Sequence, residues 1–243
     1  MSRKPRGSQA ARLRIGLAGP ASAFSLFLSS PASAQLSGSI GLDSDYRLRG
    51  YSLTDDHAAV SAQLNYDLPG GLYANVAGVA VLRDDPRVLG VIVGAGYAKR
   101  LSPKLSLDVG VLRSQIRASR AYRPGFDYTE LYAGGYFGPV MGRLSYSPDY
   151  RQAGQATLYS EIEAGFEPRH NWHVSGHLGL LTYLNSAGFY HGGDTHSDWR
   201  ISAQRRFGRL ELHSTLSGGG PSHYYGYRVH KKLALTVGTS FSF

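Results

Sequence analysis

The sequence contains no cysteine and only 2 methionines among its 243 residues. The absence of cysteine excludes a disulfide framework and any metal site with thiolate ligands. Beyond residue 34 there is no apolar run of about 18 residues, which excludes a membrane-spanning helix from that part of the chain. Glycine and tyrosine, by contrast, are abundant, at 31 and 17 residues. This composition favours an all-β chain with many turns.

Acidic residues are missing from the first 34 positions, which contain five basic residues, Arg3, Lys4, Arg6, Arg12 and Arg14. An apolar stretch, IGLAGPASAFSLFLSS, follows, and then the small residues Ala32-Ser33-Ala34. A basic start, an apolar middle and an A-x-A site are typical of a secretory signal peptide. We therefore predict a signal peptide over residues 1–34 and a mature domain over residues 35–243. The alternative, a disordered basic arm, leaves the apolar stretch unexplained.

The net charge of +9 is concentrated in this leader. Without its five basic residues, 21 basic residues remain against 17 acidic ones, so the mature domain carries +4. Binding to nucleic acid requires a basic patch on the folded domain, so no nucleic-acid partner is expected. If the mature domain conducts ions, a charge of +4 weakly favours anions.

Apolar and polar residues alternate along most of the mature chain. In the last stretch, Leu233, Leu235 and Val237 share one face with Phe241 and Phe243, and small polar residues occupy the other. Period-two alternation over about ten residues is the signature of a transmembrane β-strand, although strands of soluble sandwiches alternate too. Twelve such segments begin near residues 36, 56, 71, 88, 104, 127, 139, 156, 171, 197, 208 and 231.

The links between these segments alternate in length, which favours a membrane barrel. Short links are LPGG (68–71), LSPK (101–104), GPV (138–140), PRHN (168–171) and FGR (207–209). The other links are longer and polar, except the one around RDDPR (83–87). Outer-membrane barrels have short periplasmic turns and long outer loops. We predict an antiparallel up-and-down transmembrane β-barrel of about twelve strands, closed between the last strand and residues 36–50, in the bacterial outer membrane and surrounded by its lipid.

Aromatic residues recur near the downstream end of every second strand. They are Tyr66, Tyr97, Phe137, Phe166, Phe207, Phe241 and Phe243. Aromatic belts mark membrane interfaces, so we expect a girdle at the periplasmic rim. Candidates for an outer girdle are Tyr46, Tyr146 and Trp199.

Residues 41–76 contain Ser44, Asp45 and Tyr46, then Arg49 and Gly50, and later Gly71-Leu72-Tyr73. These residues resemble the start of the TorF family of small outer-membrane porins. The pair His57-Ala58 departs from the Pro-Ala of that family. The resemblance implies a channel but supplies no functional residues. The likeness to outer-membrane proteins in general implies that the strand ending in Phe243 is recognised by the barrel-assembly machinery.

The polar residues predicted to face inwards are candidates for a pore lining. They are Asp43, Asp45, Arg47, Arg49, Gln63, Asn65, Asp108, Arg143, Glu161, Glu163, His173, His177, Arg200 and Glu211. Charges lining a lumen tune the selectivity of a channel. The alternative is that they form salt bridges filling a closed barrel. Twelve strands suit a narrow pore, between packed eight-stranded barrels and wide sixteen-stranded porins.

No cofactor or metal site is expected. On a strand, His173 and His177 are about 13 Å apart, too far to share a metal ion, so His177 is expected to pair with Glu161. The histidines and aspartates of HGGDTHSD (191–198) are expected in a solvated loop. We therefore expect no enzyme but a passive channel for small polar or charged solutes. The alternatives are a closed barrel that displays binding loops, and an outer-membrane hydrolase, although adjacent His213 and Ser214 face opposite sides of a strand.

Overall fold

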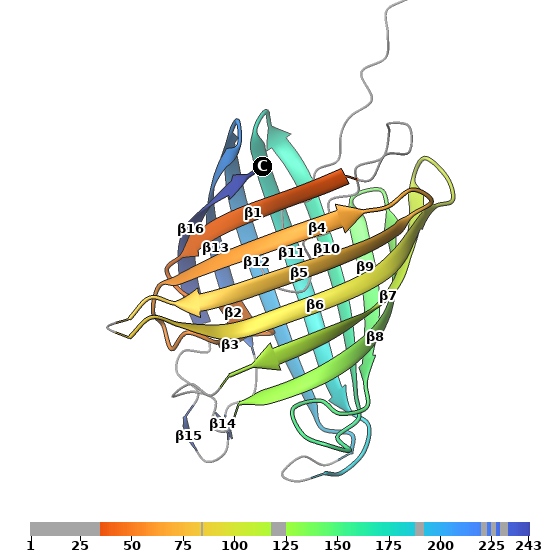
Figure 1. Ribbon diagram of the computed structural model, residues 1–243, viewed down its shortest axis with the longest axis vertical. Helices are drawn as coiled ribbons and strands as arrows, with labels where there is room; N and C mark the ends of the chain where they lie inside the picture. The colour runs from red at the N-terminus through yellow and green to blue at the C-terminus, as the bar shows by residue number, and fades with distance from the viewer. Residues whose placement is uncertain are drawn as a thin grey trace, which may run out of the picture.

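The computed structural model describes residues 35–83, 85–117, 125–187, 192–219, 223–224, 227–228 and 233–243. The predicted signal peptide, residues 1–34, lies outside this range. Twelve strands form one closed antiparallel barrel, which confirms the predicted fold (Figure 1). They are β1(Gln35–Asp43), β4(Ala59–Asp67), β5(Leu72–Val81), β6(Arg87–Arg100), β7(Leu105–Ile116), β8(Phe126–Phe137), β9(Val140–Ser147), β10(Thr157–Arg169), β11(Trp172–Tyr183), β12(Thr195–Phe207), β13(Leu210–Gly219) and β16(Leu233–Ser242). Each begins within three residues of its predicted position.

The strands follow one another around the barrel, and β16 returns to pair with β1. This seam runs from the Ser39–Ser242 pair to the Asp43–Gly238 pair, as expected for an up-and-down barrel. Closure leaves no strand edge, so the ladder hydrogen bonds are satisfied within the sheet. Two short hairpins stand outside the barrel sheet: β2(Arg47–Leu48) with β3(Tyr51–Ser52), and β14(His223–Tyr224) with β15(Tyr227–Arg228).

The outer surface of the barrel is apolar because every second residue of each strand points outwards. On β16, for example, the exposed residues are Leu233, Leu235 and Val237. An apolar surface that continues around the molecule is far larger than the patches of soluble monomers, and it matches a hydrocarbon surrounding. Within the described ranges, no helix has the length and hydropathy needed to cross a membrane.

The seven aromatic residues predicted for the girdle are exposed and lie near the ends of their strands where the short links are. They are Tyr66, Tyr97, Phe137, Phe166, Phe207, Phe241 and Phe243. Their arrangement is the one an interfacial belt requires.

The first strand is shorter than predicted. The alternation suggested a strand over residues 36–50, but β1 ends at Asp43 and the chain then turns into the barrel. The segment from residue 44 to residue 53, which contains β2 and β3, is called the inner hairpin below. A strand continued to residue 50 would direct Leu48 to lipid, but Leu48 is 8% exposed. Tyr46 packs against the interior, so it is no outer-girdle residue. Tyr146 and Trp199, the other candidates, lie on the barrel strands.

Candidate functional site: the charged lumen

The inner hairpin packs into the end of the barrel where the long links are. Leu48, Tyr51 and Leu53 join a buried cluster of wall and loop residues. The other members are Ile116, Phe126, Tyr128, Tyr150, Tyr159, Leu181 and Tyr183. Apart from Tyr150, which lies in the link between β9 and β10, each is the first or second inward-facing residue from the long-link end of its strand. The hairpin and this aromatic cluster therefore occupy the lumen at one mouth of the barrel.

Hydrogen bonds within the segment fix the shape of the inner hairpin. The Asp45 carboxylate accepts from Ser52 Oγ at 2.5 Å, from Thr54 Oγ1 at 2.8 Å and from Arg47 at 3.0 Å. The two central residues of the hairpin turn are Arg49 and Gly50, with φ of 47° and 81°. Positive φ at both central residues defines a type I′ turn, which favours Asn-Gly and is unfavourable for arginine. Arg49 therefore adopts a backbone conformation that is unfavourable for arginine.

Arg49 connects the hairpin to the barrel wall. Its Nη2 donates to Glu130 Oε1 at 2.7 Å, and its guanidinium lies 3.9 Å from the Tyr159 ring centroid and 5.5 Å from that of Tyr150. Burial alone would lower the pKa of Arg49, but the Glu130 carboxylate, together with the hydroxyls of Tyr150, Tyr128 and Tyr159, more than offsets this and raises the pKa above its usual range. Arg49 is therefore a permanent cation held by one carboxylate and two rings.

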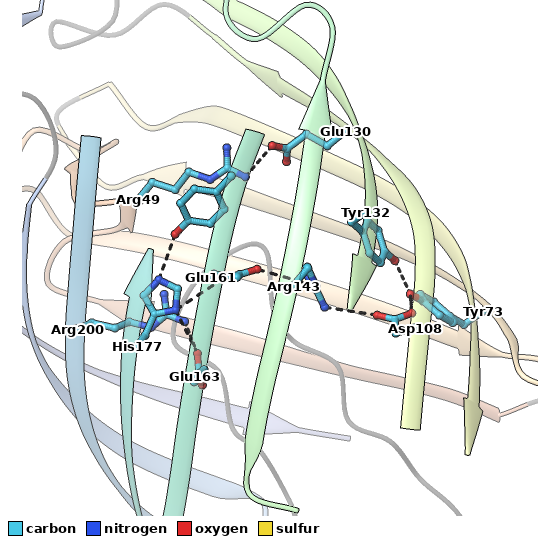
Figure 2. Close-up of polar contacts among 11 residues, drawn as sticks. Arg49, Tyr73, Asp108, Glu130, Tyr132, Arg143, Glu161, Glu163, His177 and Arg200 are labelled. Atoms are coloured by element: carbon cyan, nitrogen blue, oxygen red, sulfur yellow. Dashed lines mark hydrogen bonds and ion pairs between the residues drawn. The ribbon is translucent and has the colours of Figure 1, made fainter. Parts of the chain in front are cut away.

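Deeper in the lumen, charged side chains from five strands, β7 and β9 to β12, form what we call the charged belt, of which Figure 2 labels every member except Asp198. It consists of Asp108, Arg143, Glu161, Glu163, His177, Asp198 and Arg200. The register explains its order, since residues that pair across strands stand in one row. One row is Asp108, Gly134, Arg143, Glu161, Gly179 and Asp198, and the next contains Glu163, His177 and Arg200.

Arg143 bridges two carboxylates in the first row. Its Nη2 lies 3.5 Å from Asp108 Oδ2, and its Nε lies 3.9 Å from Glu161 Oε1. The guanidinium also lies 4.8 Å from the Tyr132 ring centroid. Tyr73 donates to Asp108 at 2.6 Å, and its hydroxyl also contacts that of Tyr132. The Arg143 guanidinium therefore contacts two carboxylates, those of Asp108 and Glu161, and the ring of Tyr132.

His177 is the centre of the second row. Its Nδ1 lies 3.7 Å from Glu161 and from Glu163, and its Nε2 lies 3.2 Å from Asp198. Tyr159 contacts the same Nε2 at 3.1 Å, and Arg200 donates to Glu163 at 2.6 Å. The belt as a whole has four carboxylates against two guanidiniums and one imidazole. With its four carboxylates ionised, the belt carries a net negative charge whether or not His177 is protonated.

The structure brings six of the predicted lumen residues together in the belt: Asp108, Arg143, Glu161, Glu163, His177 and Arg200. The other eight lie apart from it. Three of them, Asp45, Arg47 and Arg49, belong to the inner hairpin. Asp43 pairs with His213, and Glu211 pairs with Arg206. Gln63 donates a hydrogen bond to Asn65, and His173 is buried against β12. Within the described part of the chain, no group of three or more His, Asp or Glu residues could hold a metal ion.

The expected pairing of His177 with Glu161 is present, at 3.7 Å, although the two residues are not directly opposite each other. His177 stands opposite Glu163, and Glu161 opposite Gly179, because β10 continues to Arg169 and the turn is His170-Asn171. One expectation about this region needs correction. Asp198 was expected in a solvated loop but lies on β12 and is 6% exposed, since the strand begins at Thr195. His196 lies on the same strand, and His191 is outside the described residues.

Sequence reasoning missed Glu130, Tyr159 and Asp198 as site residues. Glu130 and Tyr159 alternate with outward-facing neighbours such as Leu131, so the period was a usable signal for them. The irregular pattern of glycines and tyrosines in β8 hid it. Asp198 falls within the segment predicted to begin near residue 197, but it was assigned to the preceding loop, so the alternation was not applied to it.

Arg143 offers a test of how strongly the belt is held. Arg143→Met should lower the free energy of unfolding by about 3–5 kcal/mol, because it leaves Asp108 and Glu161 buried without their cation. Arg206→Met is the matched control, since its pair with Glu211 is more exposed, with side-chain exposures of 30% and 15%, and such pairs contribute about 0–1 kcal/mol. Urea unfolding in lipid vesicles measures both. Equal losses would contradict the assigned role of Arg143.

Comparisons with known proteins agree with this fold. The family model described as "Bacterial protein of unknown function (Gcw_chp)" matches residues 29–215. Among solved structures, KdgM porin is similar with a TM-score of 0.54 and 12% identity, over 85% of this chain and 99% of that one. NanC porin is similar with a TM-score of 0.55 and 12% identity, over the same shares of the two chains. No curated protein matches the sequence.

Proposed function

This chain belongs to the Gcw_chp family of bacterial proteins of unknown function, and we propose that it is a narrow outer-membrane channel rather than an enzyme. Small polar or charged solutes would diffuse through it passively. The observation that carries the proposal is the charged belt inside a closed barrel whose outer surface is apolar. Such a barrel separates a polar interior from lipid, which is the basic construction of a porin.

Two further observations support this proposal. The barrel fold is shared with KdgM and NanC porins over most of both chains. The residues that carry the resemblance to the TorF family, Ser44 to Gly50, form most of the inner hairpin, so membership of that family is part of the proposal. The proposal also assigns two further roles. The exposed aromatics would form the periplasmic girdle, and the strand ending in Phe243 would be recognised by the barrel-assembly machinery.

The charged belt also indicates a selectivity. Its excess of carboxylates over guanidiniums favours cations, in contrast to the weak anion preference that the mature net charge suggested. The belt is the better guide, because solutes pass close to it and the exposed loop charges are screened over about 8 Å at physiological ionic strength.

A second candidate function is a closed barrel that binds a partner through its long loops. The observation in its favour is the pairing and low exposure of the belt, with Asp108 1% and His177 3% exposed. A barrel hydrolase has less support. His213, one candidate base, has its Nε2 2.6 Å from the carboxylate of Asp43, and a nucleophile beside it would have to come from another strand.

A planar-bilayer recording under a potassium chloride gradient tests the channel. The refolded mature chain should show discrete, small conductance steps and a reversal potential of the sign given by cation selectivity. Glu163→Gln should shift that potential towards anions and Arg200→Gln towards cations, because each removes one charge of the same ion pair. A folded, heat-modifiable barrel that never conducts would overturn the proposal in favour of the closed barrel.

A further inference from the structure

We propose that Glu130, with the rings of Tyr150 and Tyr159, forms a binding site for a small organic cation of the guanidinium or ammonium class. In the structure, Arg49 of the inner hairpin occupies this site. The inference deepens the proposed channel, on which its role in permeation rests, by naming the class of solute that the mouth of the lumen recognises.

The chemistry of the wall carries the first step. Glu130 is a carboxylate that is 2% exposed and faces the lumen from β8, and Tyr159 faces the lumen from β10. A buried carboxylate beside the faces of aromatic rings is the combination that binds organic cations, by charge and by cation–π attraction. The Arg49 guanidinium satisfies both parts, at 2.7 Å from Glu130 and 3.9 Å from the Tyr159 centroid.

The same aromatic cluster holds a second guanidinium. Arg151, from the link between β9 and β10, lies 4.7 Å from the Tyr51 centroid and 4.8 Å from that of Phe126. Arg151 also has a positive φ, 65°, as Arg49 does. Two arginines held in this conformation against one aromatic cluster show that the mouth of the lumen favours planar cations.

Arg49 fills the site incompletely. Its Nε and Nη1 are buried and have no hydrogen-bond partner among the described residues, so only Nη2 is paired with the wall. A buried, unpaired donor is unfavourable, which limits how tightly the hairpin is held there. The turn restricts how the Arg49 guanidinium can be oriented in the site. A free cation is not restricted in this way, so it can compete with Arg49.

The path beyond the site has the matching charge. The charged belt lies below Glu130 on the inner faces of the neighbouring strands and carries four carboxylates against two guanidiniums. A cation released from the site therefore meets an acidic wall, whereas an anion would be repelled.

Binding can be measured without ion flow, on the refolded chain in detergent, by calorimetric titration with methylguanidinium. Methylurea, which has nearly the same shape and no charge, is the control ligand. Arg49→Asn vacates the site, and asparagine suits the type I′ turn better than arginine does. If Arg49 leaves the wild-type site vacant about a tenth of the time, Arg49→Asn should bind methylguanidinium about tenfold more tightly than the wild type.

The double variants Arg49→Asn/Glu130→Gln and Arg49→Asn/Tyr159→Leu should lose this binding, and neither ligand should bind Arg49→Lys better than the wild type. Arg49→Gly, which also accepts the turn, replaces Arg49→Asn if that variant does not fold. Equal affinities in all variants, or equal binding of methylurea, would overturn the site. A chain that binds methylguanidinium but never conducts would overturn the channel instead and leave the site standing.

Discussion

Replacing residues 45–53 by a short Gly-Ser link is expected to raise the single-channel conductance several-fold. The inner hairpin contributes Leu48, Tyr51 and Leu53 to the buried cluster that occupies the long-link end of the barrel. The strands on either side, β1 and β4, pair with each other from Asp43–Ala59 onwards, so the barrel wall does not depend on the segment. Removing the hairpin should therefore open the mouth without unfolding the barrel.

A single substitution tests the same point more gently. Asp45→Ala removes the carboxylate that accepts hydrogen bonds from Arg47, Ser52 and Thr54, so the hairpin should lose its fixed shape and the conductance should rise. Asp56→Ala is the matched control, because that carboxylate is more exposed and lies 3.9 Å from Arg47. Bilayer recordings give the conductance, and heat-modifiable gel migration shows that each barrel is folded. An unchanged conductance in both the deletion and Asp45→Ala would show that the hairpin does not close the lumen.

The barrel could be predicted from the sequence because its signals are local. In a strand that separates lipid from a polar lumen, apolar and polar residues must alternate, and an up-and-down barrel must have links at both ends. The period of this alternation and the lengths of the links are therefore enough to predict the barrel. The parity of Leu233 and Val237, for example, fixes which face of β16 is exposed. Nothing beyond neighbouring residues is needed for that inference.

The inner hairpin could not be predicted in this way. Tyr46 and Leu48 continue the parity of Ile40 and Leu42, so the local pattern of a strand extends past Asp43. Whether these residues meet lipid or turn inwards depends on a cluster contributed by strands far along the chain. Only Arg49-Gly50, an unusual but possible pair for a type I′ turn, marks the hairpin locally.

The charged belt lies between these two cases. The alternation of residues along the strands predicted that Arg143, Glu161 and His177 lie on the inner face. Which of these side chains contact one another depends on the register between strands. The turn between β10 and β11 is His170-Asn171, so His177 pairs with Glu163, two residues from Glu161. A two-residue shift keeps every side chain on its face and changes only its partner, which is why the members of the belt were predicted better than their contacts.

Removing Phe243 is expected to impair folding of the barrel far more than it alters conductance. Phe243 and Gly38 exchange two backbone hydrogen bonds, at 3.0 and 3.1 Å, where the last strand meets the first. Losing both removes about 1–3 kcal/mol at the seam and leaves the partner groups of β1 unpaired. The seam is the only closure between the two ends of the described sheet, so the loss acts on the assembly of the whole barrel.

Gly38 makes the same seam testable from the other strand. A Cβ at this position would lie 2.7 Å from Phe243 Cζ and 2.8 Å from Leu64 Cδ2, so the Phe243 ring packs directly over the glycine. Gly38→Val should therefore displace the ring and reduce folding in the same direction as removing Phe243. Phe137→Ala, which deletes an equally exposed aromatic away from the seam, is the control and should fold nearly normally. The heat-modifiable fraction after refolding into lipid vesicles measures the folding, and membrane insertion in cells measures recognition by the assembly machinery. Normal refolding with impaired insertion would assign Phe243 to recognition alone, and normal values of both would contradict its role at the seam.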